Sequence, residues 1–413
     1  MIPWQSPSGK LEPAPGKEGS IEEGKGVTEG RKKLLILGAG VGSGHMRAAQ
    51  ALEAVLSELP VPLDVQVVDL LERGSPLYRL LYRSGYLALA RHTPRILDRL
   101  YGATDRLPPA LSGLLSGADR LFFRTYLREL FSSLPDLVLC THFLPLEILA
   151  PLRGLGSLSS PLWGLVTDLH PHGIWLWKGV DRYFTADGAS ASLVRKRLGG
   201  TPSSAYGIPV HPDFLKPPDR KGLLERLALP DRKTVLILSG GEGLGNLPSV
   251  LDSFSGFPGE LSLIAIAGRN AGLLEECRRW AETHENRWLF VRTLGFVENM
   301  AEWMAVSDIV VTKPGGITLF EAMALGKPLL LLPARGGQEE INRRWAIGVG
   351  AAVASPETPR AGSLLRAVLS DADRLRRMGE ASERAGSPEA AGRIAREIVD
   401  FLFSDNLCVR RTP

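Results

Sequence analysis

Cysteine is scarce in this sequence. Three cysteines occur among 413 residues, at Cys140, Cys277 and Cys408. They lie far apart and match no metal-binding spacing. An apolar core after Met1, which a signal peptide would need, is also missing. A reducing, cytoplasmic compartment is therefore the simplest interpretation.

Long apolar runs are missing too. No stretch approaches the ~18 consecutive apolar residues that a membrane-spanning helix needs. Residues 1–30 contain few large aliphatic side chains and are rich in glycine, proline, serine, glutamate and lysine. Such a segment cannot bury enough surface to offset the cost of ordering, so it is predicted to be a disordered tail. The chain as a whole is 44% hydrophobic and 23% charged, which is typical of a globular protein.

Acidic residues are rare in one segment, although the net charge of the whole chain is a modest +4. Between Arg73 and Arg128 there are ten arginines and three acids, and the stretch from Leu77 mixes tyrosine, leucine and arginine at helical spacing. This pattern fits an ordinary amphipathic helix with a solvated arginine face. It also fits a peripheral anchor whose arginines meet an anionic membrane surface. No nucleic-acid partner is expected.

Strands alternate with helical segments along the rest of the chain, which predicts parallel βαβ units. A proline-rich stretch, Pro212 to Pro218, then resembles a linker, and the strand–turn–helix rhythm restarts after it. Two open α/β domains are therefore predicted, over residues 31–211 and 219–403. Ten short apolar runs are the predicted strands: Leu34–Leu37, Val65–Val68, Leu137–Cys140, Leu162–Val166, Arg182–Thr185, Thr234–Leu238, Ser262–Ala267, Trp288–Val291, Ile309–Val311 and Pro328–Leu332.

Four glycines alternate in the turn from Gly38 to His45, which follows the first predicted strand. No Lys-Ser or Lys-Thr pair completes a P-loop here, and no G-x-G-x-x-G can be read, which argues against an NAD-linked oxidoreductase. One interpretation is a tight strand-to-helix turn with a capping histidine. The other makes His45 a general base or an acceptor-orienting group in a cleft between the domains. A nearby helix N-terminus would keep its imidazole neutral.

Two further glycine-rich turns follow predicted strands of the second domain. The segment Ser239–Gly245 suits a diphosphate, although a flexible loop would look the same. Gly315 and Gly316 would open a helix whose N-terminus binds an anion. Because ligands of such sheets lie beyond the carboxyl ends of the strands, the turns of both domains are expected to face one cleft.

Carboxylates and an amide follow these turns at positions that suit hydroxyl groups. Glu321 lies a little over one turn inside the predicted helix, where it could accept both hydroxyls of a ribose. Gln338 and Glu339 follow the strand ending at Leu332 and could bind sugar hydroxyls. The alternative for this last pair is a solvated start of a helix. Its combination with the preceding glycine segment favours the sugar site.

Several segments of the sequence resemble a known family. The segments Lys313–Ala322 and Pro333–Asn342 are similar to the nucleotide-sugar signature of glycosyltransferase family 28. The N-terminal domain resembles the monogalactosyldiacylglycerol synthase and processive diacylglycerol glucosyltransferase branch. The segments that carry this second resemblance are Gly42–His45, Thr167–Trp175, Val180–Phe184 and Gly207–Pro209. Together these segments extend the resemblance over about residues 32–401.

The resemblance implies a glycosyltransferase-B fold, in which two Rossmann-like domains face a central cleft. It allows the last helix to pack back on the N-terminal domain. It implies an inverting transfer of a hexose from a UDP-sugar to a membrane lipid, diacylglycerol, with no cofactor and no metal. The protein would then be peripheral on the inner face of the cell membrane.

Residue roles follow from the same resemblance. The donor would contact Gly240, Gly241, Phe296, Gly315, Gly316, Thr318, Glu321, Gln338, Glu339 and Asn342, with Phe296 beside the uracil. The acceptor would contact Gly42, Gly44, His172 and Trp175. His45 would lie close to the attacking hydroxyl, and Asp168 is the competing candidate for the catalytic base.

Two alternatives to this function stay open at the level of sequence. One is transfer of N-acetylglucosamine from its UDP derivative to a polyprenyl-linked acceptor. The other is a sugar-nucleotide-binding or lipid-binding protein without transfer activity. The orientation of one hydroxyl separates glucose from galactose, so the sequence does not choose between these donors.

Overall fold

The computed structural model describes residues 30–40, 44–80, 82, 85, 102, 104–105, 109–243, 247–257, 259–334 and 337–407. Residues 1–29 of the predicted tail, Gly42 and most of the segment between residues 81 and 108 lie outside the described residues. The fold set out below belongs to the compact unit that begins at Lys32. We call the part before the proline-rich stretch the N-terminal half and the part after it the C-terminal half.

The N-terminal half is built on a parallel sheet with the strand order β2-β1-β3-β4-β5-β6. Its strands are β1 (Lys32–Gly38), β2 (Leu63–Asp69), β3 (Leu137–Cys140), β4 (Leu162–Leu165), β5 (Arg182–Thr185) and β6 (Ser203–Ala205). Its helices are α1 (Gly44–Ser57), α2 (Leu70–Arg73), α5 (Pro109–Phe122), α6 (Arg124–Ser133), α7 (Phe143–Gly154) and α8 (Gly188–Arg197). Strands β3 and β4 are buried along their whole length, as expected for a parallel sheet covered on both faces.

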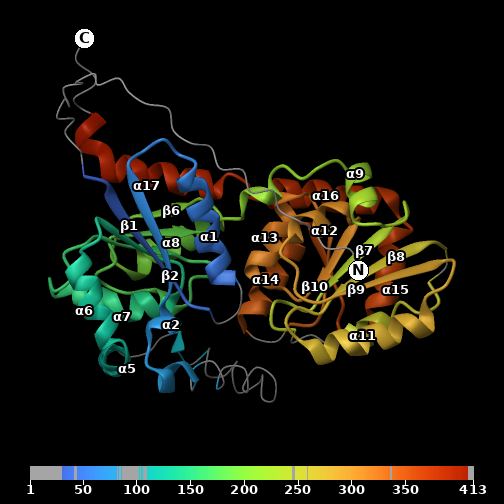
Figure 1. The fold of residues 1–413 in the computed structure, drawn as a ribbon, viewed down its shortest axis with the longest axis horizontal. Coiled ribbons are helices and arrows are strands. Elements are labelled where there is room, and N and C mark those ends of the chain that lie inside the picture. Colours follow the sequence, from blue (N-terminus) through green and yellow to red (C-terminus); the bar gives the residue numbers. More distant parts are fainter. Residues whose placement is uncertain are drawn as a thin grey trace, which may run out of the picture. The chain divides into compact units, whose positions relative to one another are not determined.

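The C-terminal half repeats this plan with the strand order β12-β11-β10-β7-β8-β9, again parallel throughout. Its strands are β7 (Thr234–Leu238), β8 (Leu261–Ile266), β9 (Leu289–Leu294), β10 (Ile309–Thr312), β11 (Leu329–Leu331) and β12 (Ala352–Ala354). Its helices are α9 (Arg220–Arg226), α10 (Leu247–Asp252), α11 (Ala271–His284), α12 (Met300–Val306), α13 (Gly316–Ala324), α14 (Gly337–Gly348), α15 (Ala361–Leu369) and α16 (Ala372–Ala385). Figure 1 shows both sheets with their helices.

Local sequence explains where many helices begin. Asp187, Asn270 and Asp371 precede α8, α11 and α16, and each side chain accepts a hydrogen bond from a backbone N–H of the first turn. These N–H groups have no partner within the helix, so such caps stabilise it. Each of the ten predicted strands coincides with a strand of the structure to within a few residues, and the two-sheet α/β fold is confirmed.

The last helix, α17 (Ala390–Leu407), returns to the N-terminal half and packs against α1 (Figure 1). Ile394 and Ile398 are fully buried in this contact. The ring of Phe401 lies 4.9 Å from that of Trp163, between centroids. The first described strand, β1, and the last described helix, α17, therefore both belong to the N-terminal half.

Replacing Ile398 by alanine tests this packing. The side chain has no exposed surface, so Ile398→Ala should lower the free energy of unfolding by about 2–5 kcal/mol. Ile347→Ala is the matched control, because that isoleucine on α14 is 39% exposed and should contribute little. Urea denaturation of the full chain measures both. Equal losses in the two variants would show that α17 is not held by buried apolar contacts.

Candidate active site

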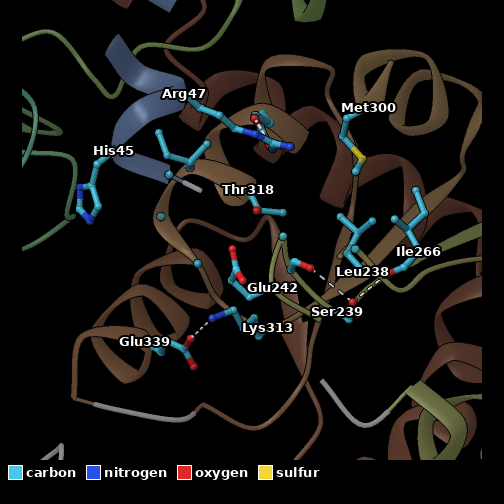
Figure 2. Close-up of a pocket in the computed structure, with 18 of the residues that line it drawn as sticks. His45, Arg47, Leu238, Ser239, Glu242, Ile266, Met300, Lys313, Thr318 and Glu339 are labelled. Carbon is cyan, nitrogen blue, oxygen red and sulfur yellow. Dashed lines mark hydrogen bonds and ion pairs between the residues drawn. The ribbon is translucent and has the colours of Figure 1, made fainter. Parts of the chain in front are cut away.

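A cavity opens where the loops after the strands of both sheets meet; we call it the central cavity. Its walls come from segments that follow β1 and β4 in the N-terminal half and β7, β8, β9, β10 and β11 in the C-terminal half. These are carboxyl ends of parallel strands, where open α/β sheets bind their ligands. Among the described residues, the lining includes every predicted donor-binding residue together with Gly44, His45 and Asp168. Figure 2 shows part of this lining.

Two glycines let the halves approach closely at this cavity. A Cβ atom added to Gly44, at the start of α1, would lie 3.1 Å from Cγ1 of Ile317 in the first turn of α13. A Cβ atom added to Gly316 would lie 3.0 Å from the carbonyl oxygen of Thr167. Both distances are tighter than ordinary contacts. The N-termini of α1 and α13 are therefore brought side by side.

His45 lies at the edge of the cavity. Its Nδ1 is 2.6 Å from Oγ1 of Thr167, and its ring meets that of His142 edge-on, at 4.4 Å between centroids. Burial lowers the pKa of His45 to about 4, while a hydrogen bond to the backbone of Thr141 opposes that shift. The imidazole is therefore neutral at pH 7. The expected cause was a helix N-terminus, whereas the principal cause in the structure is burial.

Asp168 is buried beside His45 and is held from both halves. Its Oδ2 accepts a hydrogen bond of 2.9 Å from Nε1 of Trp175, and its other oxygen accepts one from the amide of Gln338. Burial raises the pKa of Asp168 to about 7, and the Trp175 hydrogen bond works against this rise. The amide of Gln338, for which a sugar-hydroxyl role was predicted, is thus bound to a carboxylate of the other half.

The predicted acceptor residues are not all brought together. Gly44 lines the central cavity, whereas His172 and Trp175 are buried and form no part of its lining. Trp175 holds Asp168, as described. His172 caps the short 3₁₀ helix Gly173–Trp175, and its Nε2 lies 3.8 Å from Asp105. The acceptor-binding role of these residues stays a prediction, and Gly42 lies outside the described residues.

Charged residues of the C-terminal half carry ion pairs within the cavity. Both carboxylate oxygens of Glu321 accept hydrogen bonds from Nη1 of Arg47, at 3.0 and 3.1 Å. Lys313 pairs with Glu339 at 2.9 Å, which Figure 2 marks with a dashed line. Burial raises the pKa of Glu321, and the neighbouring Arg47 lowers it. Sequence reasoning assigned no role to Arg47.

Other predicted donor residues have distinct surroundings. Gly240 has a backbone φ of 83°, a left-handed conformation that glycine adopts without strain. The exposed ring of Phe296 lies 4.1 Å from the guanidinium of Arg269, measured to the ring centroid. Asn342 is buried and its Nδ2 donates to the carbonyl of Pro314, while its Oδ1 has no hydrogen-bond partner among the described residues. Within the residues that the structure describes, no group of three or more His, Cys, Asp or Glu side chains is placed to hold a metal ion.

The two halves of the chain match two different family models. Residues 45–210 match the family model of monogalactosyldiacylglycerol (MGDG) synthase, and residues 246–385 match that of glycosyl transferases group 1. The processive diacylglycerol beta-glucosyltransferases of Bacillus cereus (strain B4264) and Bacillus mycoides (strain KBAB4) are each 30% identical over 380 residues. Each match covers 91% of this chain and 94% of the relative.

The chain is therefore a glycosyltransferase that uses a UDP-sugar. It belongs to the family of the processive diacylglycerol beta-glucosyltransferases, the family 28 branch that the resemblance indicated.

Solved structures show the same fold at low sequence identity. MurG of Acinetobacter baumannii superimposes with a TM-score of 0.57 at 15% identity, covering 89% of this chain and 99% of MurG. The MnaA–UDP complex of S. aureus gives a TM-score of 0.55 at 15% identity, covering 90% of this chain and 97% of MnaA. The glycosyltransferase-B fold predicted from the resemblance is confirmed.

The opposite pKa shifts of His45 and Asp168 give a test of which residue is the catalytic base. A base works best when its pKa lies near the working pH, which favours Asp168 over His45. Asp168 must lose its proton to act, so turnover at saturating donor should rise with pH through about 7. A His45 base with a pKa of about 4 would give a level profile from mildly acidic to neutral pH.

Parallel variants complete this test. Asp168→Asn should lower turnover by ~10²–10⁴-fold and remove the rise near pH 7, because the base is lost. His45→Ala should retain that rise. Collapse of turnover in His45→Ala with a normal profile in Asp168→Asn would move the catalytic role to the histidine.

Proposed function

We propose that this enzyme transfers a hexose from a UDP-sugar to diacylglycerol, with inversion at the anomeric carbon, to give a β-glycosyl lipid. The observation that carries the proposal is the near full-length similarity to enzymes named processive diacylglycerol beta-glucosyltransferases. The arrangement of the central cavity supports it, because the donor-type motifs of the C-terminal half face the candidate bases of the N-terminal half.

On the donor side, the chemistry needs groups for a diphosphate and for hydroxyls. The first turn of α13, which begins at Gly316, offers backbone N–H groups and the positive end of a helix dipole. These groups can stabilise the negative charge that develops on the departing UDP. Glu321 and Glu339 are carboxylates that can accept hydrogen bonds from ribose and hexose hydroxyls.

On the acceptor side, the hydroxyl of diacylglycerol would enter beside Asp168. The carboxylate takes the hydroxyl proton while the oxygen attacks the anomeric carbon on the face opposite the diphosphate. A bond forms between the acceptor oxygen and that carbon, and the bond to the diphosphate oxygen breaks. One displacement of this kind inverts the configuration, so an α-linked donor gives a β-glycoside.

A panel of UDP-sugars and lipid acceptors tests the proposal on the purified full chain. We expect hexosyl transfer to diacylglycerol, with UDP released in equal amount. Transfer of N-acetylglucosamine to a polyprenyl-linked acceptor in its place would support the alternative function; the likeness to MurG, at 15% identity, shows the fold and does not favour it. UDP-sugar binding without turnover on any acceptor would contradict transfer.

A surface of the N-terminal half suits a membrane. Among the described residues, no helix is long and apolar enough to cross a bilayer. Leu77 and Leu80 are 58% and 62% exposed, and Leu121 at the end of α5 is 71% exposed. The two segments lie together, since the rings of Tyr78 and Phe122 are 5.1 Å apart. We define Leu77, Leu80, Leu121 and Phe122 as the apolar patch.

Arginines accompany this patch in the sequence, at Arg79, Arg120 and Arg124. We propose that the apolar patch enters the headgroup region of an anionic membrane surface while such arginines meet its charge. Leu121→Asp should therefore weaken sedimentation with anionic vesicles. Leu155→Asp is the matched control, because Leu155 is 78% exposed but follows α7, outside the patch.

Salt and lipid charge sharpen this measurement. Binding should fall as salt rises, because surface attraction is screened over ~10 Å at 0.1 M. Equal binding to neutral and anionic vesicles, or equal loss in the two leucine variants, would contradict the proposed surface.

A further inference from the structure

The cations of the central cavity are engaged by the carboxylates that the donor is proposed to need. Among the described residues that line this cavity, the basic side chains are one arginine, Arg47, and one lysine, Lys313. Arg47 holds Glu321, and Lys313 holds Glu339. Each pair thus joins a group suited to a diphosphate to a group suited to sugar hydroxyls.

The charge of the lining makes this arrangement unfavourable for a bound diphosphate. Four acids also line the cavity: Asp168, whose neutral form burial favours, Glu242, which pairs with Arg269, and the two partners Glu321 and Glu339. Repulsion between like charges is strong where water is partly excluded. A diphosphate, which carries at least two negative charges, needs cations turned toward it. Partner exchange within the cavity would meet that need without adding any charge.

Arg47 is placed for such an exchange. It lies three residues after Gly44, which touches Ile317 in the first turn of α13, the turn proposed to bind the diphosphate. Figure 2 shows its side chain extending from α1 into the space that Thr318 also faces. A single nitrogen, Nη1, serves both oxygens of Glu321. The guanidinium has other N–H groups in a planar fork that matches phosphate oxygens.

We propose that Arg47 is a donor-binding residue contributed by the N-terminal half. When the donor binds, its guanidinium turns from Glu321 to the diphosphate, and Glu321 is released to the ribose hydroxyls. This inference rests on the proposed function and extends it, because it makes the acceptor-binding half contribute a contact to the donor. The ion pair between Arg47 and Glu321 is then exchanged rather than kept.

In the competing arrangement, the ion pair between Arg47 and Glu321 persists when the donor binds. In that case Arg47 keeps its bond to Glu321 and orients the carboxylate for the ribose. The two arrangements differ in which part of the ligand Arg47 affects. Exchange predicts a contact between Arg47 and the diphosphate, whereas a persistent ion pair predicts an effect of Arg47 on the affinity for the nucleoside.

Calorimetric binding of UDP and of uridine to the full chain separates them. In the native protein UDP should bind more tightly than uridine. Arg47→Met should weaken UDP by about tenfold or more, since a charge-assisted contact is lost, and should leave uridine unchanged or tighter. Arg47→Lys keeps a cation and should retain part of the preference for UDP. Arg343→Met removes an arginine that pairs with Glu340 outside the cavity lining and should match the native protein.

The outcomes are distinct. An unchanged ratio of UDP to uridine affinity in Arg47→Met and Arg47→Lys, or equal weakening of both ligands, would overturn the exchange and leave the proposed function standing. Absence of UDP binding to the native chain would overturn the proposed function and the exchange with it. Circular dichroism of each variant confirms that a loss of binding is not a loss of fold.

Discussion

The close approach of α1 and α13 is the constraint on which the central cavity depends. Gly44 and Gly316 carry no side chain at the point of contact, and any Cβ there would crowd Ile317 or the Thr167 carbonyl. That approach sets two helix N-termini side by side and brings polar groups of one half within hydrogen-bonding distance of the other. Arg47 reaches Glu321 in this way, and Gln338 reaches Asp168.

Enclosure between the halves also sets the protonation of the candidate bases. The same cause, removal from water, lowers the pKa of His45 and raises that of Asp168, because it disfavours the charged form of each. The two groups therefore both tend to neutrality.

Much of the fold follows from local sequence, and the contacts between the halves do not. Strands such as Leu137–Cys140 and Thr234–Leu238 are apolar runs before polar or glycine-rich turns, and these were predicted with their bounds. Strands β6 and β12 have three residues each, Ser203–Ala205 and Ala352–Ala354, without a run of branched side chains to reveal them.

The site divides in the same way. Glycine turns after strands predict the cavity lining. His142 also follows a strand, β3, but no glycine marks its turn, so the sequence predicts no role for it. Arg47 had no local signal, because its partner Glu321 is 274 residues away and meets it through tertiary packing. The hydrogen bond from Trp175 to Asp168 had no local signal either, because a sequence does not distinguish a buried tryptophan from one that lines a site.

A crystal structure of the full chain with UDP would show directly whether Arg47 changes partners. We expect UDP in the central cavity, with its diphosphate at the first turn of α13 and Arg47, and with its ribose at Glu321. UDP bound elsewhere, or an Arg47–Glu321 pair unchanged beside bound UDP, would contradict it.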